Sequence, residues 1–169
     1  DLSVGTPVDD VAPVIREALA AASSAPGYPT THGTPALREA AVSALHRRYG
    51  ITGLDPAAVL PAIGTKELIA WLPTLLGLGA GDTVVVPELA YPTYEVGALL
   101  AGTAVVRADS LTQLGPSVLS GLRASGSSAP ALLYLNSPSN PTGKVLGVEH
   151  LRKVVGWARE RGVLVASDE

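Results

Sequence analysis

Short apolar runs that alternate with helical patterns constrain the fold of this chain more than any other feature of its sequence. The runs lack the polar alternation of a strand that has one face in water. Strands of this kind, separated by helices, are typical of a mostly parallel sheet that is covered on both faces. We expect four such strands, over residues 83–86, 104–107, 131–135 and 163–166.

The predicted fold class is therefore α/β, a three-layer αβα arrangement around this sheet. Pro35 suits the first turn of a helix and Gly50 suits the position just past its end. The last helix is amphipathic, and we expect its inward side chains to be Val148, Leu151, Val154, Val155 and Ala158. Helices are predicted over residues 11–22, 35–49, 65–76, 91–101 and 148–161.

Composition excludes several classes of function. The 169 residues include no Cys, which excludes disulfides and thiolate catalysis, and the three His lie too far apart in sequence to indicate a metal site. The twelve Lys and Arg are scattered, so we expect no nucleic-acid partner. No apolar run approaches about 18 residues, and no signal-peptide pattern is present, so we expect no membrane span and a cytoplasmic location.

The carboxyl ends of the predicted strands are the places to look for a site, because ligands of open parallel sheets gather there. Three polar segments follow apolar runs, over residues 88–94, 136–143 and 167–169. A fourth candidate is the start of the helix after Gly64, where free N–H groups and the helix dipole favour an anion such as a phosphate. The alternative at this helix is an ordinary N-cap by Thr65.

Each of the other candidates also has two interpretations. Tyr91 could stack on a flat cofactor ring or pack in the core. Asn140 lies in a loop rich in Pro, and that loop is a site or a plain turn. A carboxylate such as Asp168 at the end of a buried strand needs a cation or donors, so it caps a helix or binds a protonated ring nitrogen.

One cofactor reconciles the functional interpretations. Pyridoxal phosphate has a phosphate for a helix start, a flat ring for a tyrosine, a phenolic oxygen for an amide donor and a ring nitrogen for a carboxylate.

The same residues lie in motifs that resemble the class I/II aminotransferases, which are pyridoxal-phosphate enzymes of fold type I. The likeness runs the whole length of the chain in the family's order. The motifs are DLSVGTP at the start of the chain, GYPTTHGTPALREA from Gly27, GTKE from Gly64, GAGDTVVVPELAYPTY from Gly79, NSPSNPTGKV from Asn136 and SDE at residues 167–169.

The resemblance implies a role for each cofactor-binding candidate. Tyr91 resembles the aromatic residue that stacks on the pyridine ring, and Asn140 the asparagine bonded to the phenolic oxygen. Asp168 resembles the aspartate that pairs with the ring nitrogen. The helix start that binds the phosphate would be formed by Gly64, Thr65 and Lys66.

Two further positions are implied in the first part of the chain. Gly5 lies in a segment that resembles the one contacting the substrate carboxylate, where Asn140 would also contribute. Tyr28 resembles the tyrosine that reaches the phosphate of the neighbouring subunit's cofactor, which implies a homodimer. In domain terms, we expect residues 1–24 to be an N-terminal segment and residues 25–169 to be the first part of the cofactor-binding large domain.

Within the family, the stretches IGTKELIAWLPTLLGLG, VVVPELAYPTYEVGA and LYLNSPSNPTGKVLGV look like those of succinyldiaminopimelate transaminases. That resemblance implies transfer of an amino group between glutamate and an oxo acid, N-succinyl-2-amino-6-oxopimelate, in lysine and diaminopimelate biosynthesis. The alternatives are another class I/II aminotransferase, a C–S lyase of the same fold, or the non-catalytic aminotransferase-like domain of a transcription regulator.

The sequence departs from the family pattern in one respect that concerns chemistry. The family's Schiff-base lysine and carboxylate-binding arginine come after the Asp-Glu pair, so both would lie beyond Glu169. The lysines present do not fit the Schiff-base role; they are Lys66, Lys144 and Lys153. The chain also lacks any Met, even at its start, so we expect it to be cut from a longer protein. Because the Schiff-base lysine is missing, we expect the chain to be inactive on its own.

Overall fold

The structure is a computed structural model, and it describes residues 5–108 and 130–169. The first four residues of the DLSVGTP motif lie outside that range. The chain forms two compact units, Asp1–Pro61 and Ala62–Glu169. The boundary predicted between residues 24 and 25 separates the N-terminal segment of the family from its large domain. That boundary stays a prediction.

The first unit contains helices α1 (Pro13–Ala22) and α2 (Pro35–Tyr49) and a short 3-10 helix, η1 (Pro56–Ala58). Helix α2 begins where Thr34 accepts a hydrogen bond through its hydroxyl from the N–H of Leu37, at 3.2 Å. It ends at Gly50, whose φ of +68° places it in the left-handed region that glycine tolerates. Both predicted ends of this helix are therefore confirmed.

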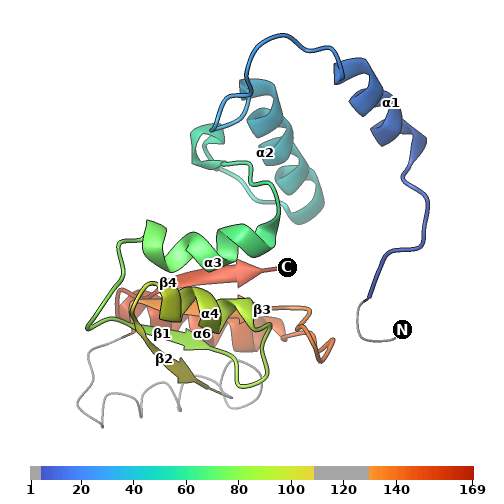
Figure 1. Cartoon of the computed structure of the whole chain (residues 1–169). Helices are drawn as coiled ribbons and strands as arrows, with labels where there is room; N and C mark the ends of the chain where they lie inside the picture. Colours follow the sequence, from blue (N-terminus) through green and yellow to red (C-terminus); the bar gives the residue numbers. More distant parts are fainter. Residues whose placement is uncertain (1–4, 109–129) are drawn as a thin grey trace. The chain divides into compact units, whose positions relative to one another are not determined.

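The second unit contains a four-stranded, entirely parallel sheet in the order β2-β1-β3-β4 (Figure 1). The predicted α/β fold with a mostly parallel sheet is confirmed. The strands are β1 (Thr83–Val86), β2 (Ala104–Arg107), β3 (Leu132–Asn136) and β4 (Leu164–Asp168), and the helices are α3 (Thr65–Leu75), α4 (Thr93–Leu100) and α6 (Val148–Glu160).

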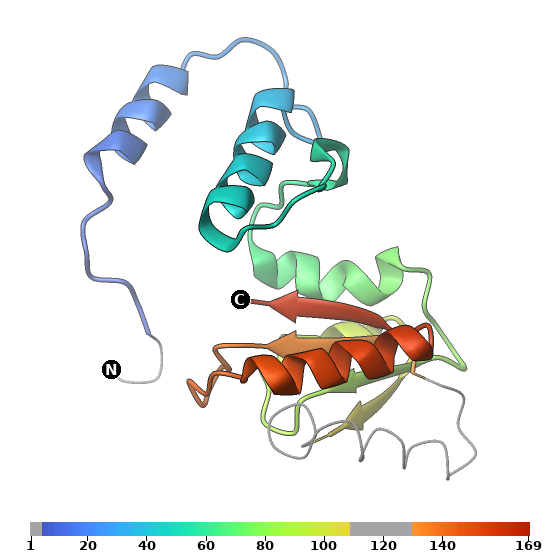
Figure 2. The same ribbon diagram turned by 180° about the vertical axis from the view of Figure 1, so that it is seen from behind.

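Helices cover both faces of the sheet, with α3 and α4 on one face and α6 on the other (Figures 1 and 2). Alternate residues of β1 and β3 divide between the two layers of core. Val84, Val86, Leu132 and Tyr134 pack with Ile69, Tyr94 and Ala98 from α3 and α4. On the opposite face Val85, Leu133 and Leu135 pack with Val154, Trp157 and Ala158 from α6. Burial of apolar side chains on both faces explains why these runs show no polar alternation.

Two predicted boundaries differ from the structure by a few residues. Helix α4 begins at Thr93 and not at Tyr91. The ring of Pro92 disfavours helical backbone at the residue before it, so Tyr91 stays in the loop after β1. Strands β3 and β4 run beyond the apolar residues, because their ladder pairs Leu135 with Ser167 and continues to Asn136 and Asp168.

The inward face of α6 was predicted correctly in part. Val154 and Ala158 are buried and Leu151 packs against the same cluster. Val148, however, is 61% exposed, and it lines a hollow along α6 together with the half-buried Val155. Trp157 is buried in the same cluster, although it was not among the residues predicted to face inward.

Close contact between α3 and α4 depends on a glycine. Gly97 lies in α4 and is buried. A Cβ at this position would lie 2.6 Å from the carbonyl oxygen of Ala70 in α3 and 2.9 Å from its Cα. Both neighbours are backbone atoms, so the two helices can be this close only if residue 97 has no side chain.

We predict that Gly97→Ala lowers the free energy of unfolding by about 1–3 kcal/mol, because the added methyl group must push the two helices apart. Gly156→Ala in α6 is the matched control, since a Cβ there meets no atom within 4 Å. The control should be stabilising by about 0.5–1 kcal/mol through helix propensity. Urea unfolding of both variants measures the difference, and equal stabilities would contradict the close approach.

Candidate functional site

The polar segments expected to form a site do meet at one edge of the sheet. Because all four strands are parallel, the carboxyl ends of β1, β3 and β4 lie at the same edge. The loop with Tyr91 follows β1, the loop with Asn140 follows β3, and Asp168 is the last residue of β4. Tyr94 contacts both Tyr91 and Asp168, and Asn136 joins the backbone of Asn140 to that of Asp168.

The carboxylate of Asp168 is held by a tyrosine that the sequence analysis did not single out. The hydroxyl of Tyr94, in the first turn of α4, donates to Oδ2 of Asp168 at 2.6 Å. The Tyr94 ring is fully buried and stacks on the ring of Tyr134 at a centroid distance of 4.7 Å. Within the described residues no donor reaches Oδ1, so that oxygen of the half-buried carboxylate is available to a ligand.

Burial and the neighbouring carboxylate keep both stacked tyrosines protonated. Burial, and after it the hydrogen bond to Asp168, raise the pKa of Tyr94 well above its ordinary value of 10.0. Burial, and then the charge of Asp168, raise the pKa of Tyr134 to about 12. Tyr94 therefore donates to Asp168 throughout the neutral and mildly alkaline range.

The loop after β3 is fixed to the end of β4 through a buried amide. Oδ1 of Asn136 accepts from the backbone N–H of Asn140 at 2.6 Å, and its Nδ2 donates to the backbone carbonyl of Asp168 at 3.0 Å. The N–H of Ser137 donates to the same carbonyl at 3.2 Å. Asn140 itself is exposed, so its own amide is free to face a ligand.

Tyr91 lies next to this cluster without being part of the core. Its ring is half-buried and meets the ring of Tyr94 edge-on, with centroids 6.1 Å apart and planes at 79°. An aromatic ring that is anchored on one side and open on the other can cover a flat ligand. This geometry suits the predicted stacking role, which stays a prediction.

The start of α3 has the backbone expected of an anion site. Gly64 precedes the helix with a φ of +87° and Thr65 is its first residue. No side chain caps this end, so the interpretation of Thr65 as an ordinary N-cap is wrong. The reason is that the glycine occupies the cap position, which leaves the first N–H groups of the helix exposed.

A cavity of about 650 Å³ joins the start of α3 to the start of α4. Lys66 supplies a positive charge there and Glu67 a negative one. Pro92 and Thr93 follow directly after Tyr91, so the predicted phosphate residues and the predicted ring-stacking residue border one region. The lining residues are Gly64, Lys66, Glu67, Ala70, Pro92, Thr93 and Val96.

Two predicted residues belong to the other unit. Gly5 is exposed, with no atom within 4 Å of where a Cβ would lie, and Tyr28 is 100% exposed. The structure therefore brings Tyr91, Asn140 and Asp168 together through contacts, and places residues 64–66 at the neighbouring cavity. The predicted roles of Gly5 and Tyr28 stay predictions.

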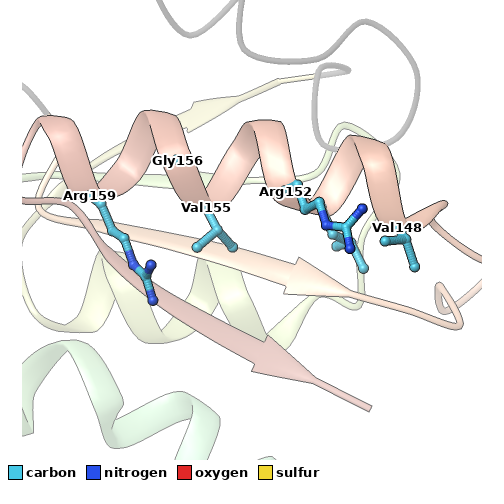
Figure 3. A pocket seen from close by; sticks show the side chains of 6 residues that line it. Val148, Arg152, Val155, Gly156 and Arg159 are labelled. Carbon is cyan, nitrogen blue, oxygen red and sulfur yellow. The ribbon is translucent and has the colours of Figure 1, made fainter.

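A second hollow, of about 350 Å³, lies along α6 (Figure 3). Its lining is apolar apart from two arginines, and none of the predicted site residues takes part. The lining residues are Val148, Leu151, Arg152, Val155, Gly156 and Arg159.

Two other kinds of site are absent from residues 5–108 and 130–169. No helix there has the length and apolar character needed to cross a bilayer. No group of three His, Cys, Asp or Glu side chains is placed to hold a metal ion.

The described donors and acceptors fit pyridoxal phosphate. Asp168 offers a free carboxylate oxygen for a protonated ring nitrogen, Asn140 an amide for a phenolic oxygen, and the uncapped start of α3 its N–H groups for a phosphate. Sequence reasoning missed Tyr94 and Asn136. The available signal for Asn136 was a polar residue at the end of a buried run, because a buried amide must find hydrogen-bond partners.

Comparison with known proteins identifies the family. The model of the family described as aminotransferase class I and II matches residues 1–169. The chain belongs to this family. A probable aminotransferase of Mycobacterium tuberculosis is 75% identical over all 169 residues of this chain. Over the same residues, 4-dedimethylamino-4-oxo-anhydrotetracycline transaminase OxyQ of Streptomyces rimosus is 54% identical.

More distant aminotransferases agree in sequence and in fold. An LL-diaminopimelate aminotransferase of Gloeobacter violaceus is 36% identical over 99% of the chain. The crystal structure of an aminotransferase from Mycobacterium tuberculosis superimposes with a TM-score of 0.84 at 31% identity, over 99% of this chain and 43% of that one. The chain spans 38%, 44% and 44% of the three sequence relatives, which is about two fifths of their length.

We predict that Tyr94→Phe lowers the free energy of unfolding by about 1.5–3 kcal/mol near pH 8, because a hydrogen bond to a charged group is lost. Tyr91→Phe is the matched control, since the described residues include no hydrogen-bond partner for its hydroxyl, and it should change stability by about 0.5 kcal/mol at most. The unfolding free energies of the two variants test the contact.

The stabilisation by the Tyr94 hydroxyl should also decrease at high pH. Folded Tyr94 keeps its proton where unfolded tyrosines, with a pKa of about 10, lose theirs, so the unfolded state binds fewer protons above that pH. The difference between wild type and Tyr94→Phe should therefore be constant from neutral pH to about pH 10 and shrink above it. A difference that grows with pH would contradict the account.

Proposed function

We propose that the whole enzyme is a pyridoxal-phosphate-dependent aminotransferase and that this chain supplies part of its cofactor-binding site. The observation that most supports the proposal is the carboxylate of Asp168 at the carboxyl edge of the sheet. Tyr94 fixes one of its oxygens and leaves the other available. Membership of the aminotransferase family supports the reaction type.

Each residue then has a task that its surroundings allow. Bound pyridoxal phosphate supplies an electron sink for the substrate's α-carbon. Asp168 holds the proton on the ring nitrogen by charge, and Tyr94 keeps the carboxylate in position for it. Asn140 donates to the phenolic oxygen, Tyr91 covers the ring, and residues 64–66 bind the phosphate.

The remaining proposals concern the first unit and the assembly. Gly5 would lie against the substrate carboxylate together with Asn140. Tyr28, whose ring touches nothing within its own unit, would reach the phosphate bound by a second subunit of a cytoplasmic homodimer.

For the substrate, we propose glutamate as amino donor and N-succinyl-2-amino-6-oxopimelate as acceptor, in lysine and diaminopimelate biosynthesis. A relative at 36% identity is named for LL-diaminopimelate, which supports an acceptor of this skeleton. A relative at 54% identity is named for an oxo-anhydrotetracycline, which favours a second candidate, a bulky cyclic ketone. Both use the same amino-transfer chemistry, so the cofactor residues do not distinguish them.

The experiment compares amino transfer from glutamate by the whole enzyme to the succinylated oxo acid, to its unsuccinylated analogue and to a cyclic ketone. We expect the succinylated acceptor to give the highest kcat/KM. Higher kcat/KM with the cyclic ketone would favour the second candidate, and no transfer from any amino donor would contradict an aminotransferase.

In the same assay Asp168→Ala should lower kcat by about 100-fold or more, the scale of a lost electrostatic contact in a transition state. Glu149→Ala is the control, because that carboxylate lies on α6 in an exposed ion pair with Arg152. It should leave kcat unchanged. Near-normal turnover by Asp168→Ala would show that the assignment of Asp168 is wrong.

A further inference from the structure

Asn136 connects the two residues that the proposed function places on the cofactor ring. It is the last residue of β3 and pairs in register with Asp168, the last residue of β4. Only 9% of Asn136 is exposed, so its amide must be satisfied within the protein. Both of its polar atoms are engaged, one by Asn140 and the other by Asp168.

The two contacts use the amide in the one orientation that satisfies both. The oxygen faces a donor, the N–H of Asn140, at 2.6 Å. The nitrogen faces an acceptor, the carbonyl of Asp168, at 3.0 Å. A flipped amide would place oxygen against oxygen and nitrogen against N–H, so this assignment follows from the network.

Neither contact involves the side chains that would touch the cofactor. Asn136 binds the backbone of Asn140 and the backbone of Asp168, and so leaves the Asn140 amide and Oδ1 of the Asp168 carboxylate free. Through one rigid amide, the backbone of the loop after β3 is held at a fixed distance from the end of β4. Displacement of either segment would therefore move a proposed ring contact.

We propose that Asn136 is a positioning residue, which sets Asn140 and Asp168 relative to each other so that both engage the same cofactor ring. The inference rests on the proposed function. It adds that the two ring contacts are coupled through Asn136, so that loss of this amide weakens both contacts at once.

Ser137 provides a control from the same loop. Its hydroxyl accepts from the N–H of Leu146 at 3.0 Å and so also fixes the loop, but among the described residues it has no hydrogen bond to Asn140 or Asp168. Ser137→Ala and Asn136→Ala should both lower the thermal midpoint of the cofactor-free enzyme. The thermal midpoint therefore does not distinguish the two variants, whereas their affinity for the cofactor does.

The test is a double-mutant cycle on the dissociation constant of pyridoxal phosphate in the whole enzyme. Asn136→Ala should weaken binding by about tenfold in the wild-type background, since two buried hydrogen bonds are lost. In an Asn140→Ala background the same substitution should cost only about threefold, because one of the two contacts that it positions is already gone. A tenfold loss in both backgrounds would overturn the coupling.

The visible absorbance of the bound cofactor gives a second readout. Its pH midpoint depends on the groups bonded to the phenolic oxygen and to the ring nitrogen. Asn136→Ala should shift this midpoint in the same direction as Asn140→Ala, while Ser137→Ala should leave it in place. An unshifted midpoint in Asn136→Ala, or an equal shift in Ser137→Ala, would show that Asn136 has a structural role only.

If Asn136→Ala does not fold, Asn136→Asp replaces it. That variant keeps the shape and the acceptor for Asn140 but places an oxygen against the carbonyl of Asp168, so the cycle is then run against Asp168→Ala. Additive losses would again overturn the inference. An unmodified enzyme that does not bind pyridoxal phosphate would overturn the proposed function and the inference with it, whereas binding with additive losses would overturn the inference alone.

Discussion

The hydrogen bond between Tyr94 and Asp168 is the contact on which the candidate site depends. It joins residues 74 positions apart and places a carboxylate at the edge of a sheet whose interior is apolar. A carboxylate there needs a donor to offset its desolvation. Tyr94 supplies that donor, and its own raised pKa keeps the proton on the tyrosine.

This contact is supported from deep in the core. Tyr94 stacks on Tyr134, and the hydroxyl of Tyr134 donates to the carbonyl of Ile69 in α3 at 3.0 Å. The packing of α3 against α4, which the missing side chain of Gly97 permits, thus bears on the position of the carboxylate. On the other side, Asn136 fixes the backbone of Asp168. The core and the site are therefore one connected structure.

The sequence alone predicted the features that depend on local patterns. Apolar runs indicated the parallel strands, and Pro35 and Gly50 marked the ends of α2 correctly. Asp168 was recognised because a carboxylate after an apolar run is conspicuous. Tyr94 as its partner was not, because that pairing arises only when α4 packs on the face of the sheet. The exposure of Val148 was also missed, because periodicity gives the face of a helix but not how closely each residue of that face meets its neighbours.

The most direct test is a crystal structure of the whole enzyme with pyridoxal phosphate. The account predicts the ring nitrogen about 2.8 Å from Oδ1 of Asp168, the usual length of a charge-assisted hydrogen bond, with Tyr94 still bonded to Oδ2. It also predicts Tyr91 over the ring and Asn140 at the phenolic oxygen. A cofactor bound elsewhere, or a ring nitrogen that does not face Asp168, would contradict it.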